Sequence, residues 1–200
     1  MRTGLLCSCV CILACAGVAQ AGLLSYEFQP TPADLYDLDH SYAYKWGLNW
    51  SPPDNAPVVA ATLEIENLKN WAVEPNILYI HLLDSAKAGV TRQYDNRSGD
   101  WYQGQGIRLT TFTDTRTSNS QPAVDWSYTF TAQDLAVLNT YVADGKFGLG
   151  FDPDCHYYND GVKLTLVVEH TPEPAMLALL GAPLPLLFAR RRQVGTRKQS

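Results

Sequence analysis

The 200-residue chain has little charge and few cysteines. Only 18% of its residues are Asp, Glu, Lys or Arg, and the formal net charge is −5. Such an acidic balance argues against a nucleic-acid partner, because phosphate backbones need a basic face. The G-x-S-x-G, H-E-x-x-H and phosphate-loop motifs do not occur, so the sequence offers no support for the enzymes that these motifs mark. We therefore expect a non-enzymatic protein.

Charge and apolar residues are unevenly distributed along the chain. Hydrophobic residues make up 46%, which is too many for a disordered chain. Residues 22–171 hold nine Lys or Arg and nineteen Asp or Glu, a net of −10, whereas residues 172–200 hold five bases and one acid. This division predicts one domain of ordinary size between two short end segments.

The first 21 residues are typical of a secretory signal peptide. Arg2 precedes an apolar stretch over residues 5–18, which ends in Ala19-Gln20-Ala21, and cleavage after Ala21 is expected. An alternative interpretation is a lipoprotein signal with Cys15 acylated. Four of the five cysteines lie in this segment, so the exported body keeps only Cys155 and must fold without an internal disulfide.

The C-terminal segment carries three features in order: a Pro-Glu-Pro motif, fifteen uncharged residues over 175–189, and an arginine cluster. As a helix, the fifteen residues would extend roughly 22 Å, short of the ~30 Å hydrocarbon core, so we expect only a marginal transmembrane anchor. The arginines would stay in the cytoplasm. A basic and polar extension follows over 193–200. The motif residues are Pro172, Glu173, Pro174, Arg190, Arg191 and Arg192.

This order of features over 172–192 resembles the PEP-CTERM sorting tail of exported bacterial proteins. The resemblance implies an exosortase, a membrane-embedded processing enzyme, as a partner. It also implies a membrane-anchored precursor that is delivered to the cell surface or the extracellular matrix. Two departures from the family pattern are the prolines at 183 and 185 and the extension after the arginines. A plain C-terminal anchor is the alternative.

Between these segments, residues 22–171 alternate with a period of two and predict an all-β body. Thr131 and Asp134 form a capping box before one short helix, which Asp144-Gly145 ends. About eight strands and one helix favour a two-sheet antiparallel sandwich of jelly-roll type. The expected strands cover 24–29, 42–48, 62–66, 77–83, 107–112, 124–131, 147–151 and 162–168.

The body also resembles uncharacterised secreted sandwich domains that accompany such sorting tails. Residues 37–40, 70–84 and 150–161 carry this likeness. It implies a fold and an exported location, but no activity.

The densest polar cluster lies before the last strand, over residues 151–161. Asp152, Asp154, Asn159 and Asp160 offer hard oxygen ligands on a turn, which suits Ca²⁺. Asp34, Asp37 and Asp39 would complete such a site if the fold brought the two loops together. The alternative is a tight turn whose backbone is capped by these side chains. A zinc site at Cys155 and His156 lacks further ligands.

Aromatic residues suggest a second function. Trp101 and Tyr102 follow a polar loop and are expected to form an exposed pair that stacks on sugar rings, whereas Trp46 and Trp126 are expected in the core. The leading hypothesis is a structural or interaction protein of the cell surface or matrix. The alternative is a carbohydrate-binding module for matrix polysaccharide, which an exposed platform of Trp50, Trp71 and Trp101 would favour.

Overall fold

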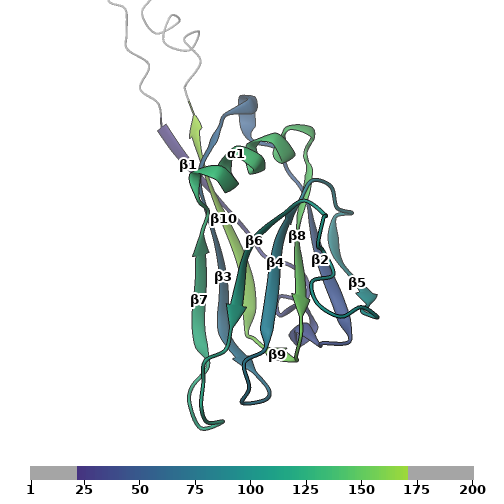
Figure 1. Cartoon of the computed structure of the whole chain (residues 1–200). Coiled ribbons are helices and arrows are strands. Elements are labelled where there is room, and N and C mark those ends of the chain that lie inside the picture. The colour runs from purple at the N-terminus through teal and green to yellow at the C-terminus, as the bar shows by residue number, and fades with distance from the viewer. Residues whose placement is uncertain (1–21, 171–200) are drawn as a thin grey trace, which may run out of the picture. The chain divides into compact units, whose positions relative to one another are not determined.

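The computed structural model describes residues 22–170; the expected signal peptide, sorting tail and basic extension lie outside the described residues. Two antiparallel sheets face each other (Figure 1). Sheet A has the order β1-β10-β3-β7, with the short β9 also paired to β3, and sheet B has the order β5-β2-β8-β4-β6. The strands are β1 (Gly22–Phe28), β2 (Tyr42–Asn49), β3 (Val58–Asn70), β4 (Ile77–Leu83), β5 (Gly89–Tyr94), β6 (Ile107–Thr113), β7 (Val124–Thr129), β8 (Lys146–Pro153), β9 (Tyr157–Tyr158) and β10 (Gly161–His170).

The order of the strands confirms the predicted sandwich of jelly-roll type. From β1 to β4 the chain passes from one sheet to the other at every step, and it does so again from β6 through β7 and β8 to β10. The eight expected strands are present. Two further strands, β5 and β9, were not expected. β5 is mostly exposed on both faces, so it shows no apolar alternation, and β9 has only two residues.

One α-helix, α1 (Ala132–Tyr141), follows β7 and lies at the end of the sandwich (Figure 1). Its predicted capping box is confirmed, since the Thr131 hydroxyl accepts from the Asp134 amide and the Asp134 carboxylate accepts from the Thr131 amide. Asn139 hydrogen-bonds both backbone groups of Val58 and so fastens the helix to β3. Short 3-10 helices are η1 (Leu35–Leu38), η2 (Pro53–Asn55) and η3 (Val142–Asp144). Within residues 22–170, no helix is long and apolar enough to cross a membrane.

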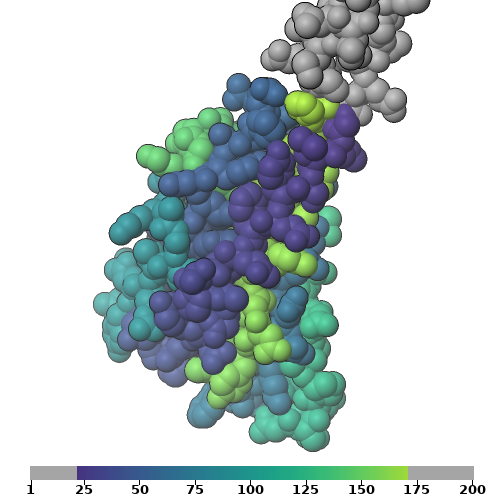
Figure 2. Space-filling model, turned by 180° about the vertical axis from the view of Figure 1, so that it is seen from behind, coloured from purple at the N-terminus to yellow at the C-terminus, as the bar shows by residue number. Residues whose placement is uncertain are grey.

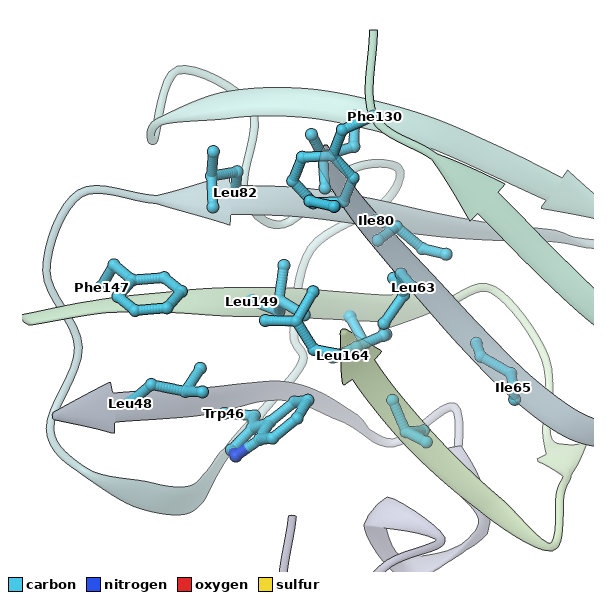
Figure 3. Packing of buried hydrophobic residues seen from close by; sticks show 14 of the residues in the cluster. Trp46, Leu48, Leu63, Ile65, Ile80, Leu82, Phe130, Phe147, Leu149 and Leu164 are labelled. Atoms are coloured by element: carbon cyan, nitrogen blue, oxygen red, sulfur yellow. The ribbon is translucent and has the colours of Figure 1, made fainter. Parts of the chain in front are cut away.

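The core lies between the inner faces of the two sheets. Trp46 and Leu48 of β2 and Phe147 and Leu149 of β8 point toward residues of sheet A such as Leu63 (Figure 3). All five are buried, as predicted for Trp46. Burial of each such side chain contributes roughly 1.5–3 kcal/mol to the free energy of folding. Trp126 of β7, which was also expected in the core, is only half-buried, and its ring packs against that of Phe112 in β6.

The first and last described residues lie opposite each other. Gly22 of β1 pairs with His170 of β10, and the two strands stay paired along the whole of β1. Figure 2 shows this purple strand beside the yellow-green end of the chain. The segments that precede and follow the body in sequence therefore join it at one end of sheet A.

The body has a core of its own, which predicts the effect of removing the sequence from Pro172 to Ser200. Deletion should leave the unfolding free energy within about 0.5 kcal/mol of the signal-cleaved chain, the usual range for changes remote from a core. Urea unfolding of residues 22–171 and 22–200, both in the same detergent, measures the difference. A broad, less cooperative transition of the shorter chain would contradict this expectation.

Candidate functional site

A row of glycines marks the outer face of sheet B. Gly47 of β2 pairs with Gly148 of β8, and Gly150 lies two residues further along β8. Their neighbours in sequence, such as Trp46 and Leu149, point inward, so the glycines lie on the outside. This alternation of large and absent side chains leaves a shallow surface on which other segments can rest.

Two loops lie directly on this row. A Cβ atom at Gly47 would lie 2.0 Å from the Lys87 carbonyl oxygen, and one at Gly148 would lie 2.6 Å from the Ala86 Cβ. A Cβ at Gly150 would lie 2.9 Å from the Tyr102 ring. The 84–88 loop and the 95–106 loop therefore cover the outer face of sheet B at van der Waals distance.

The expectation that Trp101 and Tyr102 form an exposed pair is wrong. Their exposed fractions are 8% and 2%. The Tyr102 ring fills the space above Gly150, and its hydroxyl donates to the Tyr44 carbonyl at 2.7 Å. The Trp101 ring is covered by the Arg97 guanidinium, 4.6 Å from the ring centroid. The glycines at alternate positions of β8 were the available signal that something packs outside this strand.

The three tryptophans proposed as a sugar-binding platform do not share a surface environment. Trp50 is half-buried and packs against Tyr26, Phe28 and Phe147. Trp71 is 59% exposed, whereas Trp101 is buried. The structure thus removes ring stacking on this set as a basis for carbohydrate binding.

A buried polar network connects the 95–106 loop to the sheet. The His81 ring of β4 has its Nε2 2.9 Å from Asp100 Oδ2 and its Nδ1 3.3 Å from the Gln105 carbonyl oxygen. Arg108 Nη1 lies 3.5 Å from the same Asp100 oxygen. Asp100 thereby joins the loop to β4 and β6.

Asp152 of β8 lies beneath the same loop. Its side chain is 1% exposed, and its Oδ2 accepts from the Trp101 amide at 2.7 Å, while its Oδ1 has no hydrogen-bond partner among the described residues. Burial raises the pKa of this carboxyl to about 7, against the opposing effect of the Trp101 hydrogen bond. The carboxylates of Asp95, Asp100 and Asp154 raise it further.

The four residues expected to bind calcium contact different partners. Asp152 accepts from Trp101, the Asn159 amide donates to the Asp34 carbonyl at 2.9 Å, and Asp160 accepts from Asn67 at 2.6 Å. Asp154 is exposed as a residue, but partial desolvation of its carboxyl raises its pKa, and the carboxylates of Asp95 and Asp100 raise it further.

The side chains of the second acidic loop, over residues 34–39, also hydrogen-bond to backbone amides. Asp34 and Asp39 each accept from a backbone amide two residues further on, as turn-capping residues do. Over residues 22–170, no group of three or more His, Cys, Asp or Glu side chains is arranged to hold a metal ion. The geometry favours capped turns at Asp34 and Asp39, whereas Asp152, Asn159 and Asp160 are directed to separate partners.

Two hollows on the outer side of sheet B share the side chain of Lys45. One, of about 380 Å³, lies between β2, β5 and the 95–106 loop, and Arg97 and Gln93 line it. The other, of about 540 Å³, lies beside the 84–88 loop, and Lys87 and Lys146 line it. Both volumes are within the ~300–1,000 Å³ that small-molecule sites usually have.

Known proteins add no assignment to this geometry. No protein-family model matches the chain, and no curated protein matches its sequence. Function is therefore argued from the residues of this chain.

The contact of Tyr102 with Gly150 predicts a coupled pair of substitutions. Gly150→Ala should destabilise the body by about 1–3 kcal/mol, because a methyl group there has no space. The cost should be smaller in a Tyr102→Ala background, which removes the ring that the methyl group would meet. Gly22→Ala, whose Cβ would lie 3.9 Å from its nearest neighbour, is the neutral control. Equal costs of Gly150→Ala in both backgrounds would show that the loop does not rest on Gly150.

Burial of Asp152 predicts a pH-dependent stability. The native carboxyl holds its proton up to about pH 7, whereas the unfolded one releases it near the ordinary pKa of 3.8. The native state therefore binds more protons in this window, and this group makes stability fall as pH rises from about 4 to 7. Asp152→Asn removes the charge, so the variant should gain roughly 2–4 kcal/mol relative to the original chain between pH 4 and 8, at ~1.4 kcal/mol per pKa unit.

Urea unfolding of both proteins at several pH values measures this gain. Asp144→Asn, an exposed carboxylate at the end of η3, controls for the loss of one negative charge. If the difference between the Asp152→Asn variant and the original chain were constant from pH 4 to 8, Asp152 would titrate as an ordinary carboxyl.

Proposed function

We propose that this chain is an exported bacterial protein that is sorted by a PEP-CTERM tail and acts, without catalysis, at the cell surface or in the extracellular matrix. The observation that carries the proposal is the order of Pro172-Glu173-Pro174, the apolar residues 175–189 and Arg190-Arg191-Arg192. A signal peptide over residues 1–21 fits the same route. An exosortase-type enzyme in the membrane is the processing partner of this proposal.

The architecture of the body supports a role outside the cell. Its one cysteine, Cys155, is a buried free thiol, so the body has no second thiol with which it could mispair in an oxidising compartment. Because Gly22 and His170 are paired neighbours, a tail attached after His170 would hold the body at one end of sheet A. The loops that cover the outer face belong to the other sheet, sheet B.

Within this role, the body is proposed to bind or organise other matrix components. The 95–106 loop is held to sheet B by a buried network rather than by surface contacts alone, which keeps the hollow beside it in a defined shape. Preformed hollows of this kind lower the ordering cost of binding. The basic side chains that line these hollows favour a carbohydrate ligand that carries negative charge. Exposed tryptophans, the basis of the expectation from the sequence, do not support it, since Trp101 is buried.

A substitution in the motif tests the sorting proposal. In the native host, Glu173→Ala should accumulate as a membrane-held precursor, because the processing enzyme would no longer recognise the tail. Cell fractionation and intact mass show which form is present. Glu169→Ala is the matched control, since Glu169 is an exposed glutamate of β10 just before the tail. If the Glu173→Ala protein had the mass and distribution of the control, the tail would be a plain anchor.

A further inference from the structure

We propose that the outer face of sheet B binds a segment of an acidic polysaccharide through Lys45, Lys87, Arg97 and Lys146. We call the surface formed by these four side chains and the two hollows that they line the basic trough. This inference deepens the proposed function, because it names the class of matrix component that the exported body would hold. The inference rests on the proposed function in one respect: export would bring the protein to the matrix where it meets this ligand.

Basic residues of the body are concentrated at the two hollows. Residues 22–171 contain nineteen acidic and nine basic residues, yet five of the nine basic residues line the two hollows that share Lys45. The described residues that line these hollows include no Asp or Glu. An acidic body thus carries a local cluster of basic side chains, which can attract anions.

Among the described residues, the cations of the trough have no ion-pair partner: the nearby carboxylates of Asp95 and Asp144 accept from the backbone amides of Arg97 and Lys146 and do not pair with their side chains. Elsewhere in the body, Arg108, Arg116 and Lys163 form ion pairs with Asp100, Asp114 and Glu64. Lys69 donates to the Asn119 carbonyl. In the part of the chain that the structure describes, none of the basic residues of the trough forms an ion pair. Their charge is therefore available to a ligand.

Sheet register and aromatic contacts hold the cations in place. Asn49 of β2 pairs with Lys146 of β8, and Lys45 pairs with Gly150, so both lysines lie on the outer face. The Arg97 guanidinium rests on the Trp101 ring, and Lys45 Nζ lies 6.0 Å from the Tyr102 ring centroid. A ring orients a cation without cancelling its charge. The two buried aromatics thus hold cations instead of stacking on sugars.

Arg92 also lines the smaller hollow but is left out of the trough. Its partner across the sheet is Tyr44, whose side chain is in the core, so Arg92 points to the inner side of the edge strand β5. There its guanidinium lies 4.6 Å from the ring centroids of Tyr36 and Tyr42. This contact covers the edge of the sandwich.

The chemistry of the trough favours a polysaccharide over a nucleic acid. Duplex DNA carries one charge per ~1.7 Å, which a body of net charge −10 would repel. A polysaccharide with about one carboxylate per sugar ring spaces its charges more widely, so a few cations can match them. Its hydroxyls also suit Asn49, Thr91 and Gln93, which line the two hollows. Base stacking would need exposed aromatic faces, and Trp101 and Tyr102 are buried.

Binding to polygalacturonate tests the trough. The signal-cleaved chain in detergent is titrated with polygalacturonate, with neutral dextran and with duplex DNA by calorimetry. We expect binding to polygalacturonate that weakens with added salt, and none to dextran. The double variant Lys45→Gln/Lys146→Gln should bind polygalacturonate more weakly by about tenfold or more. The reason is that each charge-assisted hydrogen bond to a carboxylate accounts for about a tenfold change in affinity. Lys69→Gln/Lys163→Gln has the same net charge and should stay within about twofold.

Several outcomes would overturn the proposal. These are no binding to polygalacturonate, equal losses in the two double variants, or tighter binding to duplex DNA. The exposed pair Lys87→Gln/Arg97→Gln gives the same test if Lys45→Gln disturbs the sheet. Unchanged urea unfolding of the trough variants separates lost binding from lost structure.

The test is independent of the sorting test. Trough variants should still reach the cell surface, and the Glu173→Ala chain should still bind polygalacturonate. Failure of one therefore leaves the other standing.

Discussion

The structure depends on strand β8 being covered on both sides. Its large residues, Phe147, Leu149 and Phe151, fill the sandwich core, while Gly148 and Gly150 between them admit two loops onto the outer face. A side chain on the outside would lift these loops from the sheet. The loops in turn bury Trp101 and Tyr102, close the polar network around Asp100, and form the walls of both hollows. One alternating sequence therefore determines the core and the candidate site together.

Period-two alternation was sufficient to predict the sandwich, because most strands bury one face and expose the other. β5 escaped prediction since the edge of a sheet exposes both faces, as in Thr91 and Arg92. The end of β3 escaped for another reason: the register shifts after Ile65, and Asn67 has a φ of 50°, so alternation stops while pairing continues. The capping box of α1 was predicted correctly because its signal is local in sequence.

The site was less predictable, because it is made by contacts between residues distant in sequence. The acidic residues around Asp152 suggested calcium, but their neighbours are decided by the fold, which sends Asn159 and Asp160 toward Asp34 and Asn67. Trp101 and Tyr102 follow a polar loop, which normally indicates exposure. Tyr102 is buried because its ring rests on Gly150, where β8 has no side chain, and the Arg97 guanidinium covers the Trp101 ring.

Trp101 links the buried network to the basic trough. Its amide donates to Asp152 on one side, and its ring carries Arg97 on the other. Asp152 Oδ2 accepts this hydrogen bond whether or not the carboxyl is ionised, because the unpartnered Oδ1 is the atom free to take the proton. A proton on Asp152 thus changes the free energy of folding without removing the contact that positions Trp101. The position of the Arg97 guanidinium on the Trp101 ring therefore does not depend on whether the Asp152 carboxyl is protonated.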